Sequence, residues 1–297
     1  MAAWSAAGQE DPFEALDKLL EGNFEGIDRS LEEQYQLIDD ALESGNARLA
    51  EEIISFWGQD ETKLPSKKQW VDYSKDFQTR RVIDFETGMV KVERLVSQDD
   101  SIFQVIDDIN EAAKSIASDS MADLSEKDLA LSYARESLAE DGIELSEAPA
   151  GSTAPILEGV SYSVDSARLK SLIIATIENS GLAKSSTAEI RKPEEKKQAG
   201  QSVSVEKKIT VSVKKIGNGK KVVRVEVPLR KNYDSVLANK YAVEISREAE
   251  IQNLPPSLLF AVMETESNFN PRARSAVPAF GLMQLVPRSG AMDAYEY

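Results

Sequence analysis

The stretch PSLLFAVMETESNFNPRARSAVPAFGLMQLVP, residues 256–287, carries the clearest chemical pattern in the chain. It should open as a helix, because proline suits a first helical turn, whose amides have no helical acceptor. Four apolar side chains then recur at helical spacing: Leu258, Leu259, Val262 and Met263. The helix should end at Asn270, since the proline that follows disfavours helical geometry in the residue before it.

Glu266 lies on the apolar face of this expected helix. It follows Val262 by four residues and Met263 by three, a spacing that places side chains on one face. Partial desolvation there favours the neutral, proton-donating form of a carboxyl group. Glu264, two residues earlier, should point about 200° away around the helix. A single glutamate near a helix end is more often a solvated charge, so its position alone does not assign catalysis.

Two motifs in this stretch carry a family resemblance. They read Glu266-Ser267-x-Phe269-Asn270-Pro271-x-Ala273-x-Ser275 and Ala279-x-Gly281-Leu282-Met283-Gln284. Together they resemble the signature of lytic murein transglycosylases of the goose-type lysozyme-like class. The resemblance implies that Glu266 is the catalytic acid and that Ser275 and Gln284 line the substrate groove. It also adds Ser267, Gly281 and Met283 as substrate-binding residues. Spacing alone predicts a turn glycine equally well at Gly281, and a methionine such as Met283 is more often in a core than in a groove.

The resemblance also implies a reaction. Ordinary glycosidases use two carboxyl groups, whereas these transglycosylases use one glutamate. It protonates the glycosidic oxygen of the MurNAc-GlcNAc β-1,4 bond. As a carboxylate it then accepts the proton of the muramyl 6-hydroxyl, which leaves a 1,6-anhydro-MurNAc end. No acid lies between Glu266 and Asp293, but a distant one such as Glu244 or Glu248 could fold nearby. No cofactor and no metal ion is expected.

The sequence ends 13 residues after Gln284, whereas the resembled domain continues through further helices. We therefore expect residues 233–297 to form an incomplete lytic transglycosylase domain that docks loosely, with weak or no murein-cleaving activity. An alternative from another class stays open: a non-catalytic protein that binds the cell wall or a protein partner through its amino-terminal domain. The intact Glu266 motif favours the enzyme, and the shortened domain favours the binding protein.

Composition excludes several classes of site. The 297 residues include no cysteine and no histidine, which excludes disulfides, thiolate or imidazole metal sites, a lipid-anchor cysteine and Ser-His hydrolases. Residues 1–183 hold 16 basic and 38 acidic side chains, which argues against nucleic-acid binding. No run approaches the about 18 apolar residues of a membrane span, and the first residues do not form a signal peptide. The resemblance implies peptidoglycan strands as the partner and a periplasmic or outer-membrane-associated location.

The amino-terminal part contains a predicted β-hairpin. Residues 81–86 and 89–93 alternate in hydrophobicity on either side of Thr87-Gly88, as paired strands do. This segment resembles the amino-terminal domain of the membrane-bound lytic murein transglycosylase C family through Trp57-Gly58, Pro65-Ser66, Val71-x-Tyr73-Ser74 and Asp84-Phe85-Glu86-x-Gly88-x-Val90-x-Val92-Glu93. Residues 12–57 should form three helices, with a break at Gly45-Asn46.

The remainder alternates helices with a second hairpin. Helices are expected at residues 99–118, 125–139 with a capping box at Ser125, 165–179, and from Asp234 through Ile251. The hairpin should pair residues 203–213 with 223–227, residues 146–159 should form a loop, and residues 184–201 should form a mobile polar segment. The sequence thus predicts an α+β fold. A mainly helical accessory domain with β-hairpins, residues 10–232, precedes a truncated α-helical lysozyme-like domain, residues 233–297.

Overall fold

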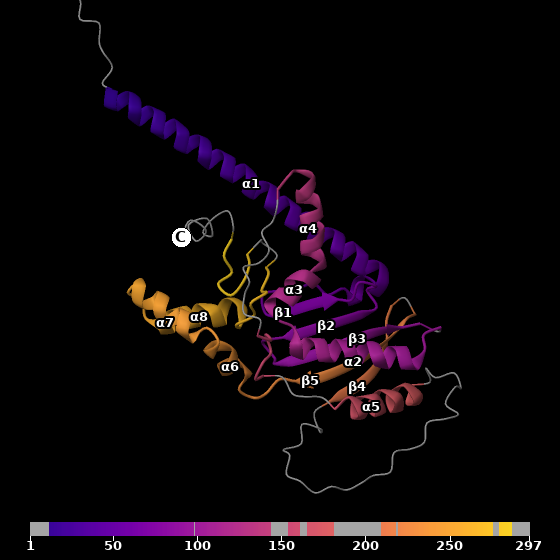
Figure 1. The fold of residues 1–297 in the computed structure, drawn as a ribbon. Coiled ribbons are helices and arrows are strands. Elements are labelled where there is room, and N and C mark those ends of the chain that lie inside the picture. The colour runs from indigo at the N-terminus through magenta and orange to yellow at the C-terminus, as the bar shows by residue number, and fades with distance from the viewer. Residues whose placement is uncertain are drawn as a thin grey trace, which may run out of the picture.

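The computed structural model describes residues 12–97, 99–143, 154–160, 165–180, 209–217, 219–275 and 279–286; the side chains of residues 12–32 and Tyr35 are not described. This part of the chain folds as helices around one five-stranded antiparallel sheet, which confirms the predicted α+β class (Figure 1). The predicted mobile segment, residues 184–201, lies outside the described residues. The elements are α1 (Pro12–Trp57), the 3-10 helix η1 (Gln59–Glu61), β1 (Gln69–Tyr73), β2 (Thr79–Asp84), β3 (Met89–Val96), α2 (Ile102–Ser118), α3 (Met121–Lys127), α4 (Leu129–Glu140), α5 (Ser166–Asn179), β4 (Thr210–Lys215), β5 (Lys221–Pro228), α6 (Tyr233–Asn239), α7 (Ala242–Ile251) and α8 (Pro256–Ser267).

Both predicted hairpins are present, and they share one sheet. β2 pairs with β3 and β4 pairs with β5, as the alternation in the sequence predicts. The strand order β1-β2-β3-β5-β4 follows because β5 also pairs with β3, with Val92 opposite Val225. Residues 203–208 of the expected second hairpin lie outside the described residues. The pairing of β3 with β5 therefore joins two hairpins that are distant in the sequence.

Helices cover both faces of the sheet. Because successive strand residues point to opposite sides, each strand contributes side chains to both buried faces. The face covered by α2 and α5 carries Trp70, Ile83, Val92, Val223 and Val225. The face covered by the carboxyl-terminal part of α1 carries Val71, Tyr73, Val82, Leu95 and Val222. The sheet is thus the middle of three layers, with helices on each side (Figure 1).

α1 is one continuous helix of 46 residues, roughly 69 Å long at 1.5 Å per residue. The predicted break at Gly45-Asn46 is therefore wrong. Gly45 is buried inside the helix, and a Cβ atom there would lie 2.5 Å from the carbonyl oxygen of Ala130. Glycine lets α1 approach α4 closely at this point. The Asn46 side chain donates to the Leu42 carbonyl oxygen at 2.8 Å, so its amide is satisfied within the helix.

The caps of α3 and α4 differ from the predicted ones. The capping box expected at Ser125 is wrong, because Ser125 lies within α3. The capping box is instead formed by Ser120 and Asp123 at the start of α3, and Asp128 caps α4. The side-chain oxygens of Ser120, Asp123 and Asp128 accept hydrogen bonds from backbone amides that have no acceptor within the helix.

The single helix expected from Asp234 through Ile251 is also wrong. The structure has two helices there, α6 and α7, interrupted at Lys240. Asn232 occupies the N-cap position of α6, and Asp234 lies in the first turn. The Lys240 ammonium donates to two carbonyl oxygens of residues 154–160, at 2.8 and 3.0 Å. These hydrogen bonds hold the chain between α6 and α7 against residues 154–160.

One hydrophobic cluster extends across the expected domain boundary at residue 233. Leu237, Ile245, Met263 and Phe269 are buried in the same cluster as the sheet residues under α2 and α5. In contrast, Leu258 on the opposite side of α8 is 47% exposed. The division into two domains stays a prediction, but the segment that contains α8 shares its core with the sheet.

A buried ion-pair network lies on the sheet. Arg80 and Glu93 are both 0% exposed, and Arg80 Nη2 lies 2.6 Å from Glu93 Oε2. Arg224 contacts the other carboxylate oxygen at 2.6 Å, and Lys63 contacts the carboxylate at 3.3 Å. The Arg80 guanidinium also stacks 4.0 Å over the Trp57 ring. Although burial opposes ionisation, these three cations hold the pKa of Glu93 below its ordinary value.

Candidate active site

Glu266 lies in the last turn of α8. The helix ends at Ser267, earlier than the predicted Asn270, because Asn268 adopts a left-handed conformation with φ 54° and caps the helix. The Glu266 side chain is 35% exposed, and Lys67 Nζ donates to its Oε2 at 2.8 Å. Glu264 is exposed to solvent. The candidate acid is thus half-buried and paired with a lysine that precedes β1.

The residues that follow α8 fasten the site to the amino-terminal half of the chain. Asn268 Nδ2 donates to the Phe85 carbonyl oxygen at 2.6 Å, and Asn270 Nδ2 donates to the Lys67 carbonyl oxygen at 3.1 Å. Asn270 is 0% exposed and Phe269 is 5% exposed. Asn270 of the first motif and the neighbouring Asn268 therefore both bind backbone next to β1 and β2.

The second motif folds back onto the first. Arg274 and Phe280 form an isolated β-bridge, and Phe280 forms another with Leu285. The Gly281 amide donates to the Ala273 carbonyl oxygen at 2.9 Å. The two motifs, which are separate in the sequence, therefore form one compact turn after α8.

Two of the predicted binding residues face the interior. Ser267 is 0% exposed, and its hydroxyl donates to the Met263 carbonyl oxygen at 2.8 Å within α8. Met283 is half-buried and packs against the main hydrophobic cluster. In this conformation both side chains stabilise the segment that carries Glu266.

The other three predicted binding residues lie in the folded turn. Gly281 has φ 72°, and a Cβ atom built there would meet no atom of the described residues within 4 Å. The Ser275 amide donates to the Ala279 carbonyl oxygen at 3.1 Å. Gln284 Nε2 donates to the Gly281 carbonyl oxygen at 3.1 Å, while Gln284 Oε1 is buried without a hydrogen-bond partner among the described residues. A buried acceptor without a partner is uncommon in folded proteins.

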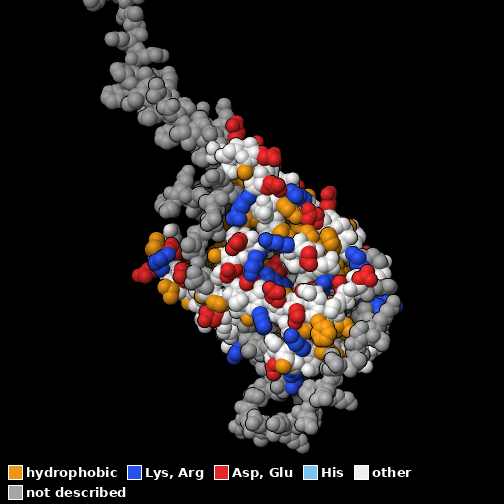
Figure 2. Space-filling view, turned by 45° about the vertical axis from the view of Figure 1, so that its right-hand side comes forward, with side chains coloured by type: hydrophobic (Ala, Val, Ile, Leu, Met, Phe, Trp, Pro, Cys, Tyr) orange, Lys and Arg blue, Asp and Glu red, His pale blue; other side chains and the backbone are white. Residues whose placement is uncertain are grey.

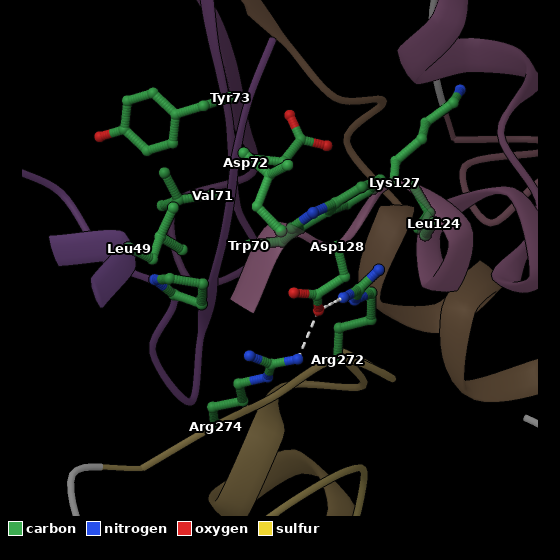
Figure 3. Close-up of a pocket in the computed structure, with 12 residues that line it drawn as sticks. Leu49, Trp70, Val71, Asp72, Tyr73, Leu124, Lys127, Asp128, Arg272 and Arg274 are labelled. Carbon is green, nitrogen blue, oxygen red and sulfur yellow. Dashed lines mark hydrogen bonds and ion pairs between the residues drawn. The ribbon is translucent and has the colours of Figure 1, made fainter. Parts of the chain in front are cut away.

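A pocket lined by both apolar and charged side chains lies where this turn meets β1 and the helices α1, α3 and α4 (Figure 3). Asp128, the N-cap residue of α4, forms ion pairs with both Arg272 and Arg274. Burial lowers the pKa of the Arg272 guanidinium; Asp128 opposes this effect and Arg274 adds to it. The single carboxylate at the start of α4 thus binds two arginines of the turn that follows α8.

Sequence reasoning missed Lys67 and Asp128. Lys67 precedes Glu266 by 199 residues, and Asp128 precedes Arg272 by 144. Acidic and basic side chains are interspersed over the face shown in Figure 2, so a single lysine or aspartate looks like an ordinary solvated charge. The sequence contains no local signal that distinguishes these two residues.

The family comparisons match both halves of this arrangement. Residues 244–297, which include α8 and the folded turn, match the Transglycosylase SLT domain. Residues 35–106, which include β1 to β3 and Lys67, match the amino-terminal domain of membrane-bound lytic murein transglycosylase C. The chain therefore combines an amino-terminal domain of this type with SLT-domain sequence.

Curated relatives extend the match over most of the chain. Membrane-bound lytic murein transglycosylase C of Actinobacillus pleuropneumoniae serotype 5b (strain L20) is 26% identical over 251 residues, which cover 84% of this chain and 55% of the relative. The proteins of the same name from Haemophilus ducreyi (strain 35000HP / ATCC 700724) and Haemophilus influenzae (strain PittGG) are each 25% identical over 248 residues, covering 84% of this chain and 55% and 56% of the relatives. The chain is a distant homologue of membrane-bound lytic murein transglycosylase C, and it spans about half the length of the curated relatives it matches.

Proposed function

We propose that this chain acts as a peptidoglycan lytic transglycosylase that cleaves the MurNAc-GlcNAc β-1,4 bond. The observation that carries the proposal is the position of Glu266, a half-exposed carboxylate at the end of α8 within sequence that matches the SLT domain. The glycan strands of peptidoglycan are the proposed substrate and partner. The reaction needs no cofactor.

The proposed chemistry uses Glu266 twice. Its carboxyl group gives a proton to the glycosidic oxygen as the bond to the anomeric carbon breaks, which releases the GlcNAc side. The resulting carboxylate takes the proton of the muramyl 6-hydroxyl while that oxygen bonds to the anomeric carbon. No water is consumed, and the product is a 1,6-anhydro-MurNAc end. Proton transfer by a positioned side chain typically contributes about 10²–10⁴ in rate.

Neutral polar groups suit a substrate of hydroxyl and acetamido groups. We propose that Gln284, whose Oε1 has no hydrogen-bond partner among the described residues, and Ser275 contact the sugar, and that the space beside Gly281 admits it. Ser267 and Met283 belong to the proposed site by resemblance. Their burial favours a supporting role over contact with the sugar.

The proposed location is the periplasm, in association with the outer membrane. The relatives are named membrane-bound, and this sequence contains no cysteine. None of the described helices combines the length and hydrophobicity that a membrane crossing requires. Other cell-wall proteins are proposed as further partners, through the domain that precedes α6.

The test is Glu266→Gln on purified murein, in this chain and in a chimera that continues with the rest of the A. pleuropneumoniae relative. Turnover should fall at least about a hundredfold, because the acid acts in the transition state. Binding of murein, measured by co-sedimentation, should be retained. Glu264→Gln is the matched control and should be nearly silent, since this side chain is exposed on another side of α8. Near-wild-type turnover of Glu266→Gln would remove the assignment.

The product distinguishes the proposed reaction from hydrolysis. Mass spectrometry of digested murein should find 1,6-anhydro ends, one water lighter than the products of hydrolysis. Reducing ends as the main product would instead mean a hydrolase with a second carboxylate. Binding of murein without any cleavage in the chimera would favour the alternative of a non-catalytic wall-binding protein.

A further inference from the structure

The part of the chain that precedes α6, the accessory half, contributes a charged side chain to the candidate site. Lys67 Nζ donates to Glu266 Oε2 at 2.8 Å, and the two side chains are 46% and 35% exposed. Among the described residues, Lys67 is the only cation paired with Glu266, and Oε1 of Glu266 receives no hydrogen bond. A substrate that brings its glycosidic oxygen to Glu266 therefore also comes close to Lys67.

The backbone of Lys67 is fixed independently of this ion pair. Its carbonyl oxygen accepts from the buried amide of Asn270 at 3.1 Å. On one side, the Ser66 amide donates to the Gln69 carbonyl oxygen at 2.8 Å; on the other, the Phe85 amide donates to the Lys68 carbonyl oxygen at 2.9 Å. The base of the Lys67 side chain is thus held both by the sheet and by the motif that contains Glu266.

We propose that Lys67 is a positioning residue for Glu266 and that the accessory half thereby completes the active site; this inference rests on the proposed function. A glutamate side chain at a helix end can adopt several rotamers. A charge-assisted hydrogen bond to Oε2 selects one of them and leaves Oε1 available for the proton. In the proposed reaction Glu266 is a carboxylate between its two proton transfers, and the ammonium holds it in place for the second.

Lys68 provides a matched control. It is the next residue, its side chain is 34% exposed, and it pairs with Glu86 at 3.0 Å, away from Glu266. Lys68→Met removes the same charge from the same segment without touching the Lys67–Glu266 pair. A difference between Lys67→Met and Lys68→Met therefore reports the pair itself and not the net charge of the segment.

The kinetic test compares these variants on murein, in the full chain and in the chimera described above. Lys67→Met should lower kcat at least about tenfold with KM within about twofold, because misplacement of a reacting group acts mainly on the transition state. Lys67→Arg should restore most of the turnover, and Lys68→Met should match the wild type. In the Glu266→Gln background, Lys67→Met should have no further effect. Unchanged thermal unfolding midpoints will show that the variants are folded.

A second measurement does not depend on activity. A water-soluble carbodiimide joins an amine and a carboxylate only where they are in contact, forming an amide with loss of one water. Mass spectrometry should find Lys67 joined to Glu266, and no link from Lys68 to Glu266. The link should vanish in Lys67→Met and in Glu266→Gln.

The outcomes separate the two proposals. If Glu266→Gln lowers turnover while Lys67→Met equals or exceeds the wild type, the proposed function stands and the role of Lys67 is overturned. If the cross-link is absent, the inference is overturned whatever the kinetics. If the cross-link forms but Glu266→Gln leaves cleavage unchanged, the proposed function fails and the positioning role falls with it, while the ion pair stands.

Discussion

Glu93→Gln tests the buried ion-pair network of the sheet. The substitution keeps the shape of the side chain and removes its charge. Arg80 is then left at 0% exposure without its charged partner, and Arg224 and Lys63 lose theirs. Removing one member of a buried pair costs about 3–5 kcal/mol, since an uncompensated charge stays in the interior. For a domain of this size that loss corresponds to about 6–20 °C in the unfolding midpoint.

Urea unfolding provides the assay. Trp57 and Trp70 are 1% and 4% exposed, so their fluorescence should report loss of both faces of the sheet, and linear extrapolation gives the free energy of unfolding. Glu226→Gln is the control, because Glu226 lies on the neighbouring strand β5 and pairs with Lys91 at 3.6 Å with 27% of its side chain exposed. That change should cost no more than about 1 kcal/mol. Equal, small losses for both variants would refute the reasoning.

The pH dependence of the stability difference between wild type and Glu93→Gln can also be predicted, including its direction. The three cations hold the pKa of Glu93 below its ordinary value, so the unfolded chain binds this proton more readily than the folded one. The stability contributed by Glu93 is then fully present above the ordinary pKa of about 4.5 and is lost as the pH falls through the lowered folded pKa. The difference between wild type and Glu93→Gln should be constant from pH 7 to 5 and shrink at lower pH. A difference that grows on acidification would contradict this account.

Two further predictions concern α1 and α8. Gly45→Ala should destabilise the chain by about 1–3 kcal/mol through overpacking against Ala130. Gly217→Ala should be nearly neutral in urea unfolding, because the nearest described atom to a Cβ there lies 3.9 Å away. Amide hydrogen exchange should be faster for residues 257–265 than for residues 102–116, because α8 fully buries only two of its side chains while α2 buries five. Equal stability of the two glycine variants would contradict the first prediction, and equal protection of the two helices the second.

The candidate site was predicted from the sequence only in part. Glu266, Gly281 and Gln284 fall in two dense motifs, and the match to the SLT domain supports that interpretation. The partners Lys67 and Asp128 were not predicted, because they come from segments 199 and 144 residues away. Nothing local distinguishes them from surface charges.

The sequence by itself determined the elements whose pattern is local. Alternation specified β2, β3, β4 and β5, and the 3.6-residue period specified α2 and α5, because burial of one face depends only on near neighbours in the chain. Tertiary structure decided what depends on distant contacts. Gly45 stays inside α1 because α4 packs against it there, and the two hairpins form one sheet because β3 pairs with β5. Lys67 meets Glu266 because Asn270 binds the backbone of the segment before β1; such contacts are set by the packing of the whole chain, and no short sequence window contains both partners.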